Sequence, residues 1–358
     1  MSQEKYVILP RKYANMTKLY PFLFKPNLHE LVWGGRKLTR WKRMPETDYI
    51  GESWEVSAVQ SSPSVIANGM WKGQTLPEVI AQMPEEVLGH QVAQQYNNQL
   101  PLLVKFIDAQ NELSIQVHPN DEMARREHGK FGKTEMWYII DADPGACVYS
   151  GFKSELTPEE YRQRVQDGTI VDALAKHEVH PGDVFYIPAG RVHAICSGVL
   201  LAEVQQSSDV TYRIFDYNRV GLDGKPRELH TKLAAKALSY KVEDEYRTMY
   251  STEENHANRV VESPYFSVRV TELVDTFHRN LKKYDSFIIT MCLKGDCKIR
   301  VRSTKDEILL HEGYSCLIPA AIADYDVTSV NGHARILDAF IDNMDRSFTQ
   351  RISRVLHL

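Results

Sequence analysis

A degenerate internal repeat constrains the fold of this chain more than any other feature. The segment His180-Pro-Gly-Asp-Val-Phe-Tyr-Ile-Pro-Ala-Gly-Arg-Val-His193 resembles the segment His311-Glu-Gly-Tyr-Ser-Cys-Leu-Ile-Pro-Ala-Ala-Ile-Ala-Asp324. Each copy has the pattern of a strand, the tripeptide Ile-Pro-Ala, a turn and a second strand. A repeat of this length predicts two copies of one β-barrel.

The rest of the chain also has mainly strand character. Short β-type runs separated by turn dipeptides occur at 56–59, 102–106, 147–149 and 184–187. The sequence therefore predicts a mainly β protein built from two jelly-roll barrels with helical insertions.

Three helical insertions are expected. The first runs from Thr75 to Tyr96, where Thr75 and Glu78 have the spacing of a capping box. The second begins at Thr157, with a proline at the first helical position, and the third covers residues 231–238.

Three regions follow from this pattern. Residues 1–18 form an N-terminal extension, residues 19–240 the first barrel with its helical segments, and residues 241–358 the second barrel. The boundary is expected near 238–260, where clustered acidic residues indicate a charged connection.

Composition excludes several classes of protein. The chain has 358 residues, 43% of them hydrophobic, and a net charge of −4, which does not fit a nucleic-acid footprint. It has no apolar run long enough for a membrane span and no signal peptide. Five cysteines without a CxxC pair predict a reduced cytoplasmic protein in which the cysteines are small core residues.

Four side chains form a candidate metal site. Gln116 and His118 are two residues apart, so on a strand both side chains point to the same face. Glu135 opens an apolar run, and His193 follows the Ile-Pro-Ala turn of the first repeat. Two imidazoles, a carboxylate and an amide suit Zn²⁺, with Mn²⁺, Co²⁺ or Fe²⁺ as alternatives. The competing interpretation is a pair of hydrogen-bonded core histidines beside a salt-bridged glutamate.

The two repeats differ at these positions. His193 of the first copy falls on Asp324 of the second, and aligning turn glycines places Glu135 on Asp285. No histidine of the second copy stands where His118 should be. The first barrel is therefore expected to bind the metal, and the second to be a packing domain without metal ligands.

Seven motifs resemble the type I mannose-6-phosphate isomerases of the cupin superfamily, in their short bacterial form. They are Leu31-Val-Trp-Gly-Gly35, Gly51-Glu-Ser-Trp-Glu-Val-Ser57, Leu113-Ser-Ile-Gln-Val-His-Pro119, Gly132-Lys-Thr-Glu135, Gly190-Arg-Val-His193, Glu203-Val-Gln-Gln-Ser-Ser-Asp209 and Thr211-Tyr-Arg213. The resemblance implies one zinc ion per chain, held by Gln116, His118, Glu135 and His193.

The resemblance also assigns the substrate site. It implies that Arg213 is an active-site residue, and that further polar residues line the site: Ser114, Lys133, Glu203, Asp209 and Arg219. Longer relatives carry a histidine where this chain has Gly132, so a role of that histidine in proton transfer cannot apply. Their helical domain is reduced here to residues 154–177, which we expect to cover the site.

An aldose–ketose isomerase needs a base that moves a proton between C1 and C2 through an enediol. Glu203 lies in an apolar strand and is preferred to Asp209 as this base, because burial raises the pKa of a carboxyl group. Arg213 on a barrel strand needs an anion, either from the substrate or from a neighbouring aspartate. Lys133 is expected to supply positive charge for an oxyanion or phosphate, the alternative being a solvated loop lysine.

The leading hypothesis is thus an enzyme of mannose and carbohydrate metabolism that interconverts mannose 6-phosphate and fructose 6-phosphate. A metal-dependent cupin dioxygenase and a sugar-binding protein without turnover are the alternatives. The expected partner is a small sugar phosphate, with no nucleic acid and no membrane, for a monomer or homodimer.

Overall fold

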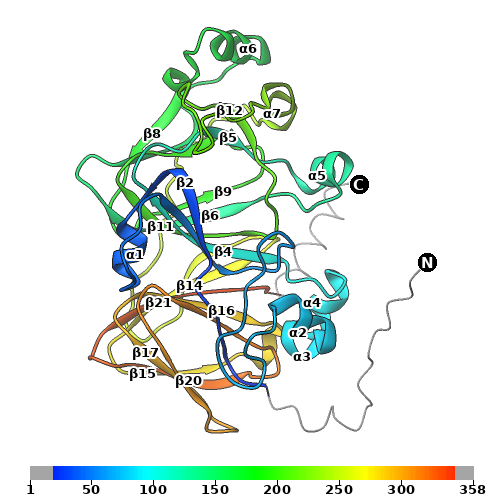
Figure 1. The fold of residues 1–358 in the computed structure, drawn as a ribbon, viewed down its shortest axis with the longest axis vertical. Helices are drawn as coiled ribbons and strands as arrows, with labels where there is room; N and C mark the ends of the chain where they lie inside the picture. Colours follow the sequence, from blue (N-terminus) through cyan, green and yellow to red (C-terminus); the bar gives the residue numbers. More distant parts are fainter. Residues whose placement is uncertain (1–18, 343–358) are drawn as a thin grey trace.

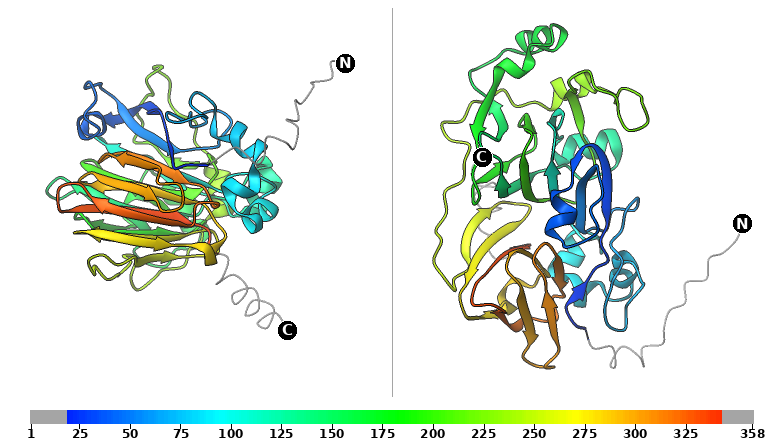
Figure 2. Two further views of the ribbon diagram at one scale, coloured as in Figure 1. Left: turned by 90° about the horizontal axis from the view of Figure 1, so that it is seen from below. Right: turned by 60° about the vertical axis from the view of Figure 1, so that its left-hand side comes forward.

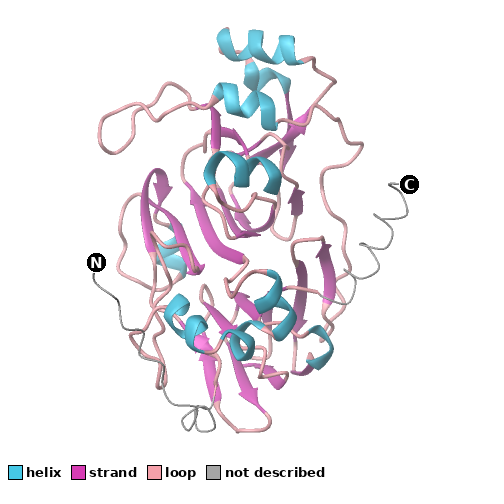
Figure 3. Cartoon of the chain, turned by 90° about the vertical axis from the view of Figure 1, so that its right-hand side faces the viewer, coloured by secondary structure: helices cyan, strands magenta, loops and turns pink. Residues whose placement is uncertain are grey.

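The computed structural model describes residues 19–342, which fold into two β-structures stacked end to end (Figure 1). The predicted N-terminal extension, residues 1–18, lies outside the described residues. Strands dominate both halves, and the helices lie around the outside of the strands (Figure 3). The fold class is therefore the one predicted, mainly β with helical insertions.

The first half consists of two antiparallel sheets. One has the order β2 (Leu28–Gly35), β3 (Ile50–Val56), β4 (Leu102–Ala109), β11 (Val199–Gln206), β6 (Glu135–Ala142) and β9 (Val184–Ile187). The other has the order β12 (Tyr212–Phe215), β5 (Ile115–Val117), β10 (His193–Ile195), β7 (Cys147–Phe152) and β8 (Leu174–Glu178). Together they form a jelly-roll-like sandwich, which we call the first barrel.

The second half repeats this plan (Figure 2). Its larger sheet has the order β1 (Phe22–Leu23), β19 (Ser315–Ile318), β16 (Ile288–Lys294), β21 (Ala334–Phe340), β14 (Ser267–Leu273) and β13 (Asn258–Glu262). Its smaller sheet has the order β15 (Thr276–Asn280), β20 (Asp324–Ser329), β17 (Cys297–Val301) and β18 (Glu307–Leu310). Strand β1 comes from the N-terminal part of the chain, so the division into 19–240 and 241–358 stays a prediction.

The central strands β4, β6 and β11 are buried on both faces. Their outward side chains, such as Val104 and Ala202, belong to a core that also contains the second barrel. Because side chains alternate along a strand, the intervening residues Lys105, Trp137 and Glu203 point into the first barrel. Charged groups are thereby placed inside the barrel.

The first expected helix is broken into α2 (Leu76–Gln82), α3 (Pro84–Leu88) and α4 (His90–Gln95). The capping box of Thr75 and Glu78 is confirmed at the start of α2. Proline begins α3, and Gly89, at φ +96°, separates α3 from α4. The other helices are α1 (Lys37–Trp41), α5 (Asp121–His128), α6 (Pro158–Gln166) and α7 (Thr231–Ala237), with short 3₁₀ turns at Ile170–Ala173 and Lys282–Tyr284.

The stretch 154–177 does not cover the metal residues, contrary to expectation. Its helix α6 lies beside α7 at the far end of the first barrel (Figure 1). Tyr161 of α6 shares a core with Ile115 and Val117, whose side chains point away from the barrel interior. No residue of 154–177 lines the cavity described below.

The pairing register corrects part of the repeat alignment. Glu135 pairs with Ile187 in the first barrel, and Ile288 pairs with Ile318 at the matching place in the second. Ile288, and not Asp285, therefore occupies the position of Glu135. The alignment through turn glycines failed because the connection from β6 to β7 is longer than that from β16 to β17.

The interior of the second barrel holds an ion pair. Asp338 lies opposite Thr290, as Glu203 lies opposite Trp137 in the first barrel. Its side chain is 1% exposed, accepts a 2.6 Å hydrogen bond from Thr290 Oγ1 and lies 2.7 Å from the guanidinium of Arg279. The second barrel thus also contains a buried carboxylate, Asp338, but there the carboxylate is paired with the buried Arg279.

The cysteines differ from expectation. Cys147, at the start of β7, forms a disulfide with Cys196, which follows β10. The prediction of five reduced core cysteines is wrong for this pair, whereas Cys292, Cys297 and Cys316 are buried thiols.

In the part of the chain that the structure describes, no helix has the length and apolar character to cross a membrane.

Candidate active site

Three of the predicted metal ligands meet inside the first barrel. The Nε2 atoms of His118 and His193 lie 3.1 Å apart, and each is 3.4 Å from a carboxylate oxygen of Glu135. The amide end of Gln116 lies 3.3 Å from His193 Nε2. His118, Glu135 and His193 are fully buried, and within residues 19–342 they form a group able to hold a metal ion.

The strand order explains this convergence. Gln116 of β5 pairs directly with His193 of β10, and Glu135 begins β6 in the facing sheet. The turn between β9 and β10 is fastened by the Gly190 N–H, which donates a 2.9 Å hydrogen bond to the His118 carbonyl. Gly190 has φ +89°, a conformation that other residues adopt only with strain. Strand pairing and this turn therefore bring the four side chains to one place in the barrel.

Both imidazoles are oriented for metal binding. The His118 Nδ1–H donates to the Val210 carbonyl at 3.0 Å, and the His193 Nδ1–H donates to the Arg191 carbonyl at 2.8 Å. These bonds leave the Nε2 lone pairs directed at Glu135. Burial lowers the pKa of His118 to about 3 and also lowers that of His193, so both rings are neutral at pH 7.

The donor set fits a divalent transition metal. Glu135 Oε1 is buried and has no hydrogen-bond donor among the described residues. An unpaired buried carboxylate oxygen is costly, and two hydrogen-bonded core histidines would leave it unpaired. Two neutral imidazoles, one carboxylate and an amide oxygen of Gln116 would satisfy a metal and leave a position for substrate.

A chain of alternating charges extends from this group. Lys133 is 5% exposed and lies 2.9 Å from Glu135 Oε2 and 3.9 Å from Glu203 Oε1. Lys105 follows, with its ammonium group 3.5 Å from Glu203 and 3.4 Å from Glu52. Lys133 is therefore not the solvated loop lysine that was the alternative.

Glu203 is held by one hydrogen bond and by ion pairs with two lysines. Its Oε2 accepts a 3.0 Å hydrogen bond from Trp137 Nε1, whereas its Oε1 has no hydrogen-bond donor among the described residues. Burial and the charge of Glu135 raise the pKa of Glu203, and the two lysines oppose that shift. Glu203 thus has one oxygen held by the Trp137 hydrogen bond and one oxygen that can still accept a hydrogen bond or a proton.

A cavity of about 200 Å³ lies beside the possible metal-binding group. Of the four proposed ligands, Gln116 lines it, whereas His118, Glu135 and His193 do not. The predicted site residues that line it are Ser114, Gln116, Lys133, Glu203, Asp209 and Arg213. Trp33 and Trp54 also line it, but the predicted substrate residue Arg219 does not.

Arg213 reaches the cavity from β12. Its Nε–H donates a 3.3 Å hydrogen bond to Ser114 Oγ, and its NH1 group donates to the Glu228 carbonyl at 2.9 Å. The sequence left open a pair between Arg213 and an aspartate. In the structure the hydrogen-bonded partners of the Arg213 side chain are neutral.

Sequence reasoning missed three charged residues that line the cavity. Lys105 is the one charged residue in the apolar run 102–107, and a lysine in such a run was a usable signal. Glu52 lies within the motif Gly51–Ser57, which by itself gave it no role in the site. Arg227 lies on the connection after β12 and gave no local signal.

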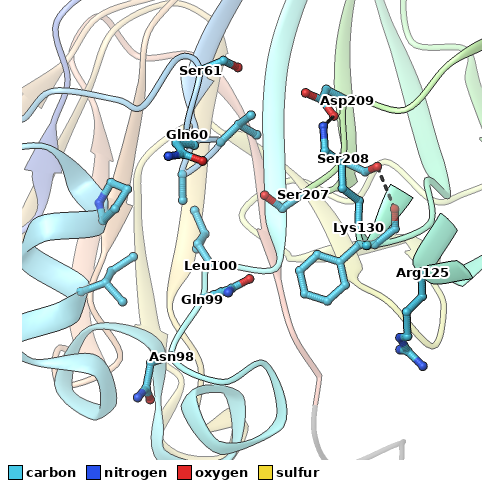
Figure 4. Close-up of a pocket in the computed structure, with 16 residues that line it drawn as sticks. Gln60, Ser61, Asn98, Gln99, Leu100, Arg125, Lys130, Ser207, Ser208 and Asp209 are labelled. Atoms are coloured by element: carbon cyan, nitrogen blue, oxygen red, sulfur yellow. Dashed lines mark hydrogen bonds and ion pairs between the residues drawn. The ribbon is translucent and has the colours of Figure 1, made fainter. Parts of the chain in front are cut away.

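Asp209 lies at the edge of the cavity. Lys130 forms an ion pair with it at 2.6 Å. Both residues also line a neighbouring hollow of about 710 Å³ (Figure 4), whose outer wall includes Arg125 and Gln60. Asp209 is therefore a paired group at the cavity mouth, in contrast to the buried Glu203.

Comparisons with known proteins agree with this geometry. Residues 22–148 match the family "Phosphomannose isomerase type I, catalytic domain", and residues 256–339 match "Mannose-6-phosphate isomerase, cupin domain". The chain is 38% identical to mannose-6-phosphate isomerase ManA of Bacillus subtilis over 77% of this chain and 86% of that protein. It is 32% identical to the mannose-6-phosphate isomerase of Streptococcus mutans over 85% and 94%.

Solved structures show the same relation. The crystal structure of the mannose 6-phosphate isomerase from Bacillus subtilis superposes with a TM-score of 0.79 at 31% identity, covering 89% of this chain and 99% of that one. A putative mannosephosphate isomerase from Archaeoglobus fulgidus gives a TM-score of 0.74 at 26% identity, covering 91% and 99%.

Proposed function

The chain belongs to the type I phosphomannose isomerases, and from this premise we propose that it interconverts mannose 6-phosphate and fructose 6-phosphate by proton transfer through an enediol. The observation that carries this proposal is a cavity lined by Gln116, Glu203 and Arg213. Lys133 also lines this cavity and connects it to the possible metal-binding group through its ion pair with Glu135. The relation to isomerases disfavours the dioxygenase and the non-catalytic sugar-binding protein.

We propose that Gln116, His118, Glu135 and His193 hold one Zn²⁺. The nitrogen and oxygen donors and the neutral imidazoles support this choice. When bound, the ion supplies Lewis-acid stabilisation of charge on substrate oxygens. Lys133 beside Glu135 adds positive charge on the same side of the cavity, where it can donate to a developing oxyanion.

Glu203 is the proposed base. The Trp137 hydrogen bond to Oε2 fixes the carboxylate plane. Oε1 lies near the Lys105 and Lys133 ammonium groups but accepts no hydrogen bond from the described residues, and it can accept the proton from C1 or C2 and return it to the other carbon. A raised pKa brings its proton affinity closer to neutral pH, which a general base requires. Asp209 is less suited, because its carboxylate is exposed and paired with Lys130.

Arg213 and Ser114 are proposed to bind the anionic part of the substrate. Arg213 has no carboxylate in its hydrogen-bonded shell, so its charge is available to a ligand. Asp209 would contact sugar hydroxyls at the cavity mouth, whereas the predicted contact of Arg219 has less support, since Arg219 does not line the cavity.

A cytoplasmic location and a monomeric or homodimeric state remain proposals. Three buried thiols support a reducing compartment, and the Cys147–Cys196 disulfide is the observation against it.

A coupled assay tests the proposed function. Purified protein should convert mannose 6-phosphate to fructose 6-phosphate, and Glu203→Gln should lose this activity while keeping its metal content. A wild-type protein that is folded, metal-loaded and inactive on mannose 6-phosphate would refute the proposal.

A further inference from the structure

Two arginines bind one aspartate where β12 leaves the barrel, and a third arginine stands nearby on β12. Asp216 is 5% exposed, and its Oδ1 accepts hydrogen bonds from Nε and NH2 of Arg219 at 3.0 and 2.8 Å. Arg227 binds both carboxylate oxygens, through Nε to Oδ2 at 2.7 Å and through NH2 to Oδ1. Arg213 stands three residues earlier on β12 and is close enough for Arg227 to affect its pKa. Of these arginines, Arg213 and Arg227 line the cavity.

The charges of this group do not balance. Three guanidinium groups and one carboxylate leave a net charge of +2 in a partly buried place. The Glu228 carboxylate nearby is largely exposed to water, so its charge is screened. Because unbalanced buried charge is costly, the group is suited to a ligand with two negative charges. A phosphate monoester carries about −1.5 to −2 at pH 7.

The connection after β12 fixes Arg227 relative to Arg213. The Arg213 NH1 group donates to the carbonyl of Glu228, the residue next to Arg227. The His230 N–H donates to the Arg213 carbonyl at 2.7 Å, which ties the end of the connection to the strand. These hydrogen bonds hold the connection that carries Arg227 against Arg213, and both arginines line the same cavity.

The two partners of Asp216 have different surroundings. Arg219 does not line the cavity, so its attachment to Asp216 can persist when a ligand enters. Arg227 holds Asp216 through Nε and NH2, so its NH1 group can donate to an incoming phosphate while both Asp216 oxygens keep their hydrogen bonds.

We propose that Arg227 is a phosphate-binding residue of this enzyme, acting together with Arg213, and that Arg219 holds Asp216 as the support of the site. The inference rests on the proposed function and adds a residue that confers preference for phosphorylated sugars. Arg227 acts on binding and orientation, and Glu203 acts on the proton.

The test compares Arg227→Gln with wild type and with Arg162→Gln, a control on the exposed surface of α6. Loss of a charge-assisted hydrogen bond should raise KM for mannose 6-phosphate about tenfold or more. The inhibition constant of inorganic phosphate should rise by a similar factor, while kcat changes much less. Arg162→Gln should match wild type in all three quantities.

Unchanged KM and unchanged phosphate inhibition in folded Arg227→Gln would overturn the inference. If that variant does not fold, Arg227→Lys replaces it and should show the same changes to a smaller extent. Lysine keeps the positive charge but lacks the planar guanidinium group with its several donors. Should wild type fail to turn over mannose 6-phosphate, the proposed function fails separately. Calorimetric titration of wild type and Arg227→Gln with inorganic phosphate would then test whether Arg227 binds phosphate.

Discussion

Replacing Trp137 by phenylalanine isolates the role of Glu203. The change removes the indole N–H that donates to Glu203 Oε2 at 3.0 Å and keeps an aromatic ring beside His193. A hydrogen bond to a charged group is worth about 1.5–3 kcal/mol. The neutral carboxyl group accepts the same hydrogen bond more weakly. Only the difference between the two forms, roughly half of this free energy, changes the ionisation equilibrium of Glu203. Since one pKa unit corresponds to about 1.4 kcal/mol, the pKa of Glu203 should rise by about one unit.

The acid limb of the pH profile reports this shift. Glu203 must be deprotonated to act as a base, so kcat/KM should rise with pH through its pKa in the free enzyme. In Trp137→Phe the limb should move to higher pH by about one unit. Trp33→Phe is a matched control, because Trp33 lines the same cavity but has no hydrogen bond to Glu203.

The reasoning would be refuted by an unmoved acid limb in Trp137→Phe at normal metal content, even if kcat fell at every pH. That result would show that the limb belongs to another group and that Glu203 is not the base.

Two further substitutions test other parts of the account. Arg213→Ala should lower kcat/KM by a factor on the order of 10² or more, as loss of a charged substrate contact does, with metal content unchanged. If the variant instead lost its metal, the assignment of Arg213 to substrate would be wrong. Asp338→Ala should lower the free energy of unfolding by about 3–5 kcal/mol, because it leaves Arg279 buried and unpaired. Urea unfolding measures this loss, and reduced activity per folded molecule would contradict a purely structural role for the second barrel.

The repeat and the meeting of His118, Glu135 and His193 were predictable because their signals are local. The i, i+2 spacing of Gln116 and His118 on a strand determines their common face, and the motif around His193 marks the start of the next strand. The class of fold followed from the same periodicity.

Other features depend on pairing between distant segments. Lys105 meets Glu203 only through the register of β4 and β11, and Cys147 meets Cys196 only through that of β7 and β10. Arg227 reaches the cavity through an irregular connection. No local pattern encodes such contacts.

Metal removal and restoration test the central claim most directly. Chelator-treated protein with measured loss of metal should lose mannose-6-phosphate isomerase activity, and stoichiometric Zn²⁺ should restore it. The apo protein should also melt at a lower temperature, since an ion that binds only the folded state stabilises it. Full activity in protein shown to be free of metal would contradict the account.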